Sequence, residues 1–206
     1  MAGKEKGLFI VVSAPSGAGK TTICKEVLRT VPELSYSVSF TTRPMRDGEI
    51  NGKDYFFVSE AEFRERIAAD DFAEWTEKFG CLYGTSIQVM EESLSSGNDL
   101  LLDIDTEGAK NLKNRFSHGI FVFVLPPSLD ALKTRLMGRG SETEGNMCIR
   151  LEKAKYEMKE IFWYDYVIIN NDIQTAVNQL KSIYIAEKIK KDRVINNIIS
   201  EFNLEE

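Results

Sequence analysis

The segment Leu8-Phe-Ile-Val-Val-Ser-Ala-Pro-Ser-Gly-Ala-Gly-Lys-Thr-Thr22 joins an apolar run to a glycine-rich turn. Residues 8–12 are mostly β-branched or large and apolar, so they predict a strand buried on both faces. Residues 21–30 follow the turn and predict a helix. This order of strand, turn and helix is typical of α/β proteins.

The turn matches the phosphate-binding pattern G-x-x-x-x-G-K-[ST], with alanine in place of the first glycine. Gly17 and Gly19 let backbone N–H groups turn inward around phosphate oxygens, and the positive end of the following helix faces the same anion. Lys20 is placed to reach the β- and γ-phosphates, and the Thr21 hydroxyl is placed for Mg²⁺. The alternative, an ordinary glycine-rich turn, is disfavoured by the Lys-Thr pair. The predicted nucleotide-binding residues are Ala14, Pro15, Ser16, Gly17, Ala18, Gly19, Lys20, Thr21 and Thr22.

Three more apolar runs extend the pattern along the chain. They cover residues 100–105, 121–125 and 166–170, and helical segments at 128–137, 147–161 and 172–202 lie between and after them. Buried strands that alternate with helices predict an α/β fold in which helices cover both faces of a parallel sheet.

Two regions interrupt this alternation. Residues 37–97 hold short strand-like pieces at 36–41 and 55–58 and then short helices, which predict a small α+β insertion. Residues 138–145 are polar, glycine-rich and flanked by arginines, so they predict a mobile tip between two helices. A chain of 206 residues is expected to form one core with such insertions.

Composition narrows the classes of function. A net charge of −6 disfavours a broad nucleic-acid surface but permits a small basic pocket for a phosphorylated ligand. The three cysteines are odd in number and widely spaced, and therefore predict a reducing, cytoplasmic compartment rather than a disulfide framework. No apolar run approaches the roughly 18 residues of a membrane span, so no membrane partner is expected.

Asp103 and Asp105 end the predicted strand 100–105. An acidic residue at the end of a buried strand commonly holds or orients the Mg²⁺ shell in phosphate-loop proteins, which makes Asp103 the candidate, acting through water. Residues two apart in extended chain point to the same side, at the strand end where α/β proteins bind ligands. A helix cap or a turn is the alternative role for either aspartate.

The polar loop Ser37-Val-Ser-Phe-Thr-Thr-Arg-Pro-Met-Arg-Asp-Gly-Glu-Ile-Asn-Gly-Lys-Asp-Tyr55 carries two arginines and a tyrosine. Arginine forks bind phosphate, and a tyrosine hydroxyl can complete such a site. From near its start to about residue 190, the chain resembles guanylate kinase. The resemblance rests on the phosphate loop, this loop and the pieces Glu74-Trp75, Tyr83-Gly-Thr85, Leu102-Asp-Ile-Asp105, and Arg135…Gly138-Arg139-Gly140…Arg150.

The resemblance implies a nucleoside monophosphate kinase that transfers a phosphoryl group from ATP to GMP, and also to dGMP, with Mg²⁺. It implies a nucleotide-binding core at residues 1–37, 94–133 and 152–206, a GMP-binding insertion at 38–93 and a lid at 134–151. These small molecules are the implied partners of a monomer or homodimer. By position, the GMP phosphate is held by Arg43, Arg46, Tyr55 and Tyr83. The guanine O6 is bonded by Ser39 and Thr85, and its N1–H and 2-amino group by Glu74 and Asp105.

The chemistry of guanine agrees with that set. Its Watson–Crick edge offers one acceptor and two adjacent donors, so hydroxyl donors and carboxylate acceptors complement it. Adenine lacks the 2-amino group and presents an acceptor at N1. A site built to bond a substrate group rejects the analogue that lacks it by up to about 10⁴- to 10⁵-fold. The alternatives are a helix-surface position for Glu74, a core position for Tyr83 and a solvated position for Arg43 or Arg46.

Arginines flank the predicted tip. Phosphoryl transfer concentrates negative charge, so catalysis is mostly positioning and cationic stabilisation. The resemblance implies that Arg135, Arg139 and Arg150 contact phosphates and that Asn170 lies near the adenine base. A charged helix face is the alternative for Arg150, and a turn for Asn170. The implied catalytic residues are Lys20, Arg43, Asp103, Arg135, Arg139 and Arg150.

Some residues depart from the family pattern. Pro44 directly follows Arg43 where the family more often has R-x-P-R, and Glu107 stands where glutamine is frequent. The tail at 191–206 receives no role. Two other functions are open: a scaffold domain that binds phosphopeptides, and a kinase of another phosphorylated substrate such as a ribose bisphosphate. The Lys20-Thr21 pair argues against the first, and the guanine-reading set against the second.

Overall fold

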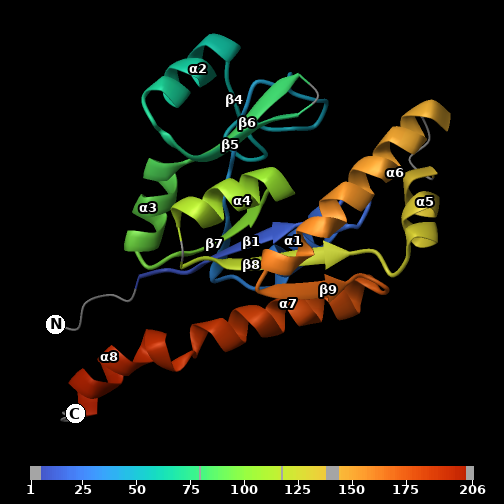
Figure 1. Cartoon of the computed structure of the whole chain (residues 1–206). Helices are drawn as coiled ribbons and strands as arrows, with labels where there is room; N and C mark the ends of the chain where they lie inside the picture. The colour runs from blue at the N-terminus through green and yellow to red at the C-terminus, as the bar shows by residue number, and fades with distance from the viewer. Residues whose placement is uncertain (1–5, 79, 117, 138–143, 203–206) are drawn as a thin grey trace.

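The main sheet of the computed structural model has five parallel strands in the order β2-β7-β1-β8-β9 (Figure 1). The structure describes residues 6–78, 80–116, 118–137 and 144–202. The strands are β2 Leu34–Tyr36, β7 Asp99–Asp103, β1 Phe9–Ser13, β8 Ile120–Leu125 and β9 Tyr166–Ile169. The parallel sheet predicted from the alternation of apolar runs and helices is thus confirmed.

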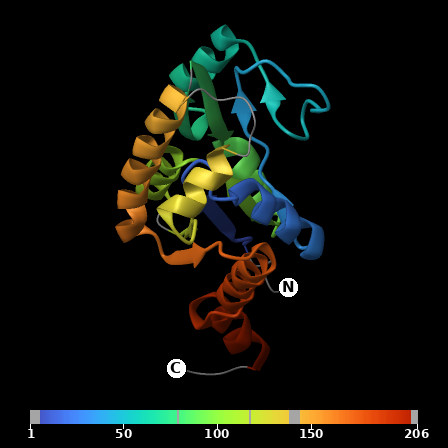
Figure 2. The same ribbon diagram turned by 90° about the vertical axis from the view of Figure 1, so that its right-hand side faces the viewer.

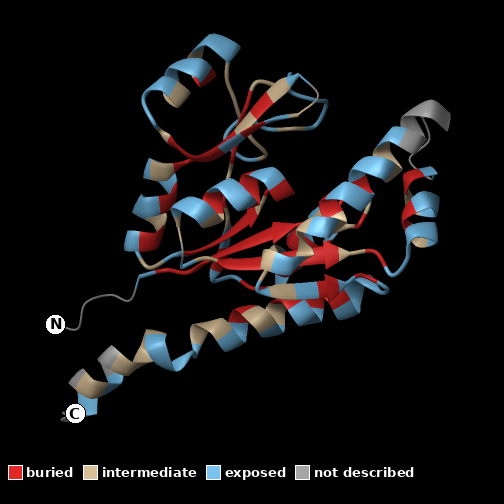
Figure 3. Ribbon diagram, viewed as in Figure 1, coloured by how far each residue is buried: buried red, intermediate tan, exposed pale blue. Residues whose placement is uncertain are grey.

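Helices cover both faces of this sheet, whose strands are largely buried (Figure 3). Leu8, Ile10 and Val12 pack on one side with helices α1 Lys20–Thr30 and α7 Ile173–Lys188. Phe9 and Val11 pack on the other side with α3 Ile87–Ser95 and α4 Thr106–Arg115. Since each face has its own apolar layer, the central strand consists of apolar residues without the alternation of a half-exposed strand.

The strand order places the phosphate loop at a topological switch point. From β1 the chain runs through α1 to β2 on one side, whereas β7 leads through α4 to β8 on the other side. The loops after β1 and β7 therefore diverge at the carboxyl ends of neighbouring strands, which is where open α/β sheets bind ligands.

A second, smaller sheet lies above that edge, with the order β4-β3-β6-β5 (Figure 1). Its strands are β3 Phe40–Thr41, β4 Phe56–Phe57, β5 Phe72–Lys78 and β6 Cys81–Ser86, and helix α2 Glu60–Ala68 packs on it. Phe40, Phe63, Phe72 and Leu82 form its small core. The hairpin β5–β6 therefore projects as a unit with an apolar side and a polar side.

Helices α5 Leu129–Met137 and α6 Glu144–Met158 pack through Leu132, Leu136 and Ala154. A 3₁₀ turn, Lys159–Trp163, leads from α6 into β9. The last helix, α8 Lys191–Phe202, extends beyond the main sheet on the side away from the second sheet (Figures 1 and 2). Within the described residues, no helix is long and apolar enough to cross a membrane.

The structure corrects three predicted elements. The run 100–105 ends as a strand at Asp103, because the Asp105 side chain accepts a hydrogen bond from Gly108 N at 2.9 Å and caps α4. The piece 36–41 is divided: β2 pairs with β7 in the main sheet, and β3 belongs to the second sheet. The helical stretch 172–202 is two helices, since α7 ends at Lys188 and α8 begins at Lys191.

Candidate active site

The phosphate loop depends on two left-handed glycines. Gly17 has φ 92° and Gly19 has φ 95°, a region that L-residues with a side chain rarely adopt. Gly19 is the N-cap residue of α1, and no side chain accepts a capping hydrogen bond there. The first backbone N–H groups of the helix are therefore not used by a side-chain cap. The loop therefore presents backbone donors and the positive helix end at the carboxyl end of β1.

Asn170 and Arg135 form hydrogen bonds that hold the backbone of the phosphate loop. Asn170 is only 4% exposed and donates from Nδ2 to Ala18 O at 2.7 Å. Arg135 donates to Ala18 O at 3.4 Å and to Asn170 O at 2.9 Å. A Cβ on Gly19 would lie 2.4 Å from the Asn170 amide nitrogen, so this close approach requires glycine. These contacts fix the path of the loop backbone.

Lys20 pairs with the carboxylate predicted to lie near the metal. Its ammonium lies 2.8 Å from Asp103 Oδ1 and also donates to the carbonyl of Ile104. Burial lowers the pKa of Lys20, but the attraction of Asp103 outweighs it, so the pKa is raised overall. Lys20 thus stays charged at the mouth of the phosphate loop.

The described residues contain no group of three or more His, Cys, Asp or Glu side chains that would hold a metal alone. Mg²⁺ sites in nucleotide enzymes need fewer protein ligands, because substrate phosphates and water complete the octahedron. Asp103 at the end of β7 and the exposed Thr21 at the start of α1 supply the oxygen donors that such a site requires. These donors fit Mg²⁺ bound together with a nucleotide.

Two carboxylates meet at the first turn of α4. Glu74 of β5 is 5% exposed and accepts a hydrogen bond from Thr85 Oγ1 at 2.6 Å. A Cβ on Gly108 would lie 2.4 Å from Glu74 Oε2 and 3.4 Å from Asp105 Oδ1, so both carboxylates approach the same point. Burial, and then the charge of Asp105, raise the pKa of Glu74 to about 7.

Two further residues of β5 face the same place, and sequence reasoning missed them. Thr76 Oγ1 lies 3.5 Å from Asp105 Oδ2, and Lys78 Nζ lies 3.7 Å from the same oxygen. Side chains alternate along a strand, so Glu74, Thr76 and Lys78 share one face. That period of two, counted from Glu74, would have placed them on the same strand face as Glu74, although not near Asp105.

In the polar loop 37–55, the carboxylate of Glu49 holds the side chain of Arg43. Arg43 forms a bidentate pair with Glu49, with N–O distances of 3.0 and 2.7 Å. Its guanidinium lies 5.4 Å from the centre of the Tyr55 ring, and the rings of Tyr55 and Tyr83 are 6.1 Å apart. Burial is the main cause that raises the pKa of Tyr55, so its hydroxyl stays protonated as a donor.

Other predicted residues lie around this group. Arg46 is exposed, and its backbone N–H donates to Glu49 at 2.7 Å. Ser39 is buried just before β3. Arg150 is half-buried on α6, which rises opposite the second sheet (Figure 1). Arg139 lies outside the described residues.

Known proteins resemble this chain over almost its whole length. The family profile "Guanylate kinase" matches residues 6–187. The guanylate kinase of Geobacter sulfurreducens is 48% identical over 202 residues, which are 98% of this chain and 100% of that protein. The guanylate kinase of Syntrophus aciditrophicus is 51% identical over 198 residues, or 96% and 95% of the two chains. The crystal structure of guanylate kinase from Anaplasma phagocytophilum superposes with a TM-score of 0.79 at 32% identity and 98% coverage of both chains.

Proposed function

This chain belongs to the guanylate kinase family and catalyses ATP-dependent phosphorylation of GMP, and on that premise we propose which of its side chains perform the reaction. The observation that carries the assignment is the segment 103–105. Lys20 of the phosphate loop binds Asp103 and the Ile104 carbonyl, while Asp105 faces Glu74. Three successive residues thus join the phosphate loop to a pair of carboxylates suited to guanine.

In this proposal, the protein forms hydrogen bonds with the donors and with the acceptor on the Watson–Crick edge of guanine. Glu74 and Asp105 accept from N1–H and the 2-amino group, and Ser39 and Thr85 donate to O6. Thr85 donates to Glu74 in the protein without substrate, so its hydroxyl hydrogen turns to O6 when guanine supplies N1–H to the carboxylate. Adenine would leave these buried carboxylates without donors, which costs free energy. The same contacts serve dGMP, because none involves the ribose.

Arg43, Arg46, Tyr55 and Tyr83 bind the phosphate of GMP in this proposal. Arg43 has five N–H donors; its pair with Glu49 uses two of them, and a bond from Nη1 to the Pro44 carbonyl at 2.7 Å uses a third, which leaves two for a phosphate. Glu49 therefore orients the guanidinium rather than occupying it. The neighbouring tyrosine hydroxyls add neutral donors that suit a phosphate already neutralised by arginine.

Residues 14–22 bind ATP in this proposal, with Lys20 directed to the transferred phosphoryl group. Mg²⁺ would be held by Thr21 and, through water, by Asp103, where it would neutralise charge on the phosphates. Asn170 and Arg135 support the loop through Ala18 O, which extends the predicted adenine-side role of Asn170 to positioning. We propose that Arg135, Arg139 and Arg150 contact the phosphates from the lid, residues 134–151. For Arg135 this role is additional to its hydrogen bonds with Ala18 O and Asn170 O.

The reaction needs no covalent intermediate on the protein. The oxygen of the GMP phosphate attacks the γ-phosphorus of ATP in line, and ADP leaves. Cationic groups stabilise the charge that spreads over the transferred group, and closure of the cleft excludes water that would hydrolyse ATP.

We propose a cytoplasmic location for the protein, and the free thiols of Cys24 and Cys81 are compatible with it.

A panel of nucleoside monophosphates, each with ATP and Mg²⁺, tests the proposed base reading. GMP and dGMP are expected to support rapid ADP formation, and AMP and UMP only slow formation. Glu74→Gln is expected to reduce this preference. An unchanged GMP-to-AMP ratio in that variant would show that Glu74 does not read the base.

A further inference from the structure

Helix α6 carries a buried carboxylate to which the proposed mechanism gives no role. Glu157 is 6% exposed, and its Oε2 has no hydrogen-bond partner among the described residues. Burying a carboxylate oxygen without a hydrogen-bond partner costs free energy, so we look for a partner that this atom takes in another state of the protein. Glu157 lies close enough to Ser16 of the phosphate loop and to Lys78 of β5 for both to affect its ionisation.

The charged groups around Glu157 identify candidate partners. Lys78 and Lys153 act on it as cations, the backbone N–H of Ser16 is within hydrogen-bonding range, and Asp105 acts as a second anion. Burial is the main cause that raises the pKa of Glu157, and Lys78 opposes it. Lys153 lies one turn earlier on the same helix, whereas Lys78 comes from β5 across the cleft.

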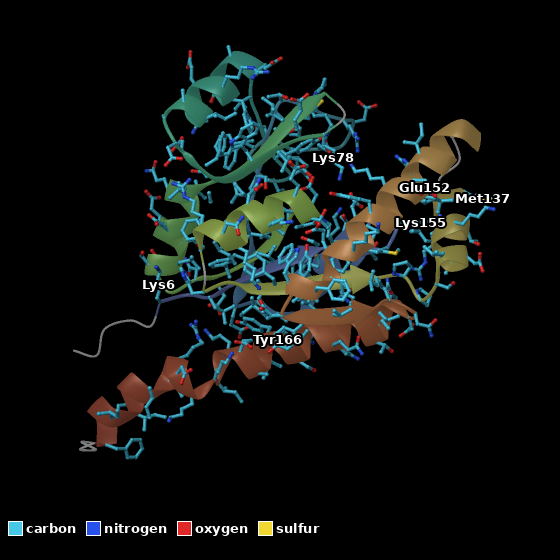
Figure 4. All side chains as sticks on the ribbon, viewed as in Figure 1. Lys6, Lys78, Met137, Glu152, Lys155 and Tyr166 are labelled. Carbon is cyan, nitrogen blue, oxygen red and sulfur yellow. The ribbon has the colours of Figure 1, made fainter. Side chains whose placement is uncertain are left out.

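Lys78 lies between two carboxylates. Its ammonium is 3.7 Å from Asp105 Oδ2, and its side chain is 29% exposed. Glu157 attracts the same ammonium, and Lys20 and Lys153 repel it. Figure 4 shows Lys78 on the side of the second sheet that faces α6. Its four-carbon stem is flexible, so the ammonium can change partner without movement of the strand.

Asp105 cannot serve Lys78 and guanine equally well. Its Oδ1 already accepts from Gly108 N, and its Oδ2 faces Thr76 and Lys78. If the 2-amino group of guanine donates to this carboxylate, it competes with the lysine for Oδ2. The displaced ammonium then needs another anion, and the unpartnered oxygen of Glu157 is available nearby.

We propose that Lys78 and Glu157 are a positioning pair for the acceptor substrate: when GMP binds, the Lys78 ammonium moves from Asp105 to Glu157 Oε2. The exchange frees Asp105 for guanine and ties the β5–β6 hairpin to α6, the helix that carries Arg150. This inference rests on the proposed role of Asp105. The move of Lys78 would thus couple the binding of GMP to the position of α6.

A double-mutant cycle measured on the KM for GMP tests the pair, with Glu157→Gln and Lys78→Met as the single changes. Glu157→Gln keeps the shape of the side chain but removes the anion, and is expected to raise this KM about fivefold or more, because Lys78 then stays on Asp105. In the Lys78→Met background, the same change is expected to have little effect. Lys78→Arg, which retains the charge, is expected to recover part of the coupling.

Exposed charges on the same helix provide matched controls. Glu152 and Lys155 pair with each other at 2.7 Å, both side chains are exposed, and both are labelled on α6 in Figure 4. Glu152→Gln and Lys155→Met are expected to leave the KM for GMP unchanged. Circular dichroism and melting temperature are measured for every variant, so that misfolding is recognised.

The outcomes separate this inference from the proposed function. Additive effects of the two changes on the KM for GMP would overturn the exchange. A loss of kcat in Lys78→Met that is equal in both backgrounds would also overturn it and would place Lys78 on the phosphates. Asp105→Asn tests the premise: if it leaves the GMP-to-AMP preference unchanged, the proposed base reading fails, whatever the cycle shows. A crystal structure with GMP is expected to show Lys78 bonded to Glu157, and a lysine still on Asp105 would contradict the proposal.

Discussion

Single side chains at the centre of the cleft have separable tasks. Lys20 is the clearest example, because it is half-buried and charged, and its partners among the described residues are groups of the segment 103–105. Its ammonium has to leave Asp103, at least in part, to meet a phosphoryl group. Removing it leaves the guanine side of the cleft intact, since Glu74 and Thr85 bond each other without it.

Lys20→Ala is therefore expected to lower kcat by about 100-fold or more, the usual cost of removing a group that stabilises charge in the transition state. GMP binding, measured by calorimetry, is expected to stay close to that of the unmodified protein. Lys155→Ala, an exposed change, is the control. If Lys20→Ala turned over at the normal rate, Lys20 would not be acting on the phosphoryl group.

If Glu74 reads guanine as proposed, GMP recognition depends on pH. Its pKa of about 7 in the protein without substrate is raised by burial from an ordinary value of 4.5, and only the ionised form accepts from N1–H. The KM for GMP is expected to fall as the pH rises through about 7 and then to level off. Glu74→Gln should remove that component while the ionisation of the GMP phosphate remains. A curve of the same shape in both proteins would contradict the assignment.

The raised pKa of Glu74 also affects the stability of the fold, which is expected to decrease with rising pH, whereas GMP binding is expected to improve. Between pH 4.5 and about 7, folded Glu74 keeps a proton that the unfolded chain has lost. The free energy of unfolding therefore decreases as the pH rises across this window. Glu74→Gln is expected to flatten the decrease, as measured by urea denaturation at several pH values. A steeper decrease in the variant would mean that Glu74 is not buried in its neutral form.

At the scale of elements, the site is made by contacts between loops that the sequence separates widely. The amide of Asn170, after β9, reaches the phosphate loop after β1. Asn170→Ala would remove the shorter of the two side-chain hydrogen bonds that the described residues donate to the Ala18 carbonyl and leave the 3.4 Å contact from Arg135. We expect a loss of about 1–3 kcal/mol in the free energy of unfolding. The KM for ATP should rise more than the KM for GMP, and the reverse order would argue against a positioning role.

The contact between α4 and β5 allows a complementary test. Alanine is a better helix former than glycine, yet a Cβ on Gly108 would lie 2.4 Å from Glu74 Oε2. Gly108→Ala is expected to push the two elements apart and to lower kcat/KM for GMP by about 10- to 100-fold. The ATP affinity of the variant, measured by calorimetry without GMP, is the control. Normal GMP kinetics would show that the carboxylates do not need this close approach.

Sequence reasoning located the elements best where the signal was local. The apolar run before the glycine-rich turn predicted β1, and the pattern of Gly17, Gly19 and Lys20 predicted the loop conformation. The residues of the site that it missed, Thr76 and Lys78, lie near Asp105 only because β5 packs across α4. The orphaned oxygen of Glu157 was likewise not foreseeable, since burial and pairing depend on the tertiary fold.

Element ends were harder to predict for a related reason. Asp105 continues an apolar run in the sequence, but its side chain caps α4, so the strand ends two residues earlier. Residues 36–41 were predicted as one extended piece, yet Tyr36 belongs to β2, which pairs with β7, whereas β3 pairs with β6. The choice between partners depends on strands that are distant in sequence, which local propensity does not encode.

For the whole molecule, α8 stands apart from the catalytic body. The family profile ends at residue 187, and α8 begins at Lys191. A contact of Arg193 with the Lys6 carbonyl ties it to the start of the chain, far from the cleft. Removing residues 191–206 is expected to change kcat and both KM values by no more than about twofold, as surface changes usually do. A large loss of kcat would instead assign this helix a part in the motion of the enzyme.

The direct succession of Asp103, Ile104 and Asp105 has a consequence for engineering. One short length of backbone carries Asp103, which pairs with Lys20, and, two positions on, Asp105, the proposed acceptor for guanine. A redesign that moved residue 105 to admit a different purine would also displace the partners of Lys20. Altered substrate preference is therefore best sought on the β5–β6 side of the pocket, at Glu74 and Thr85, where changes leave the triphosphate machinery in place.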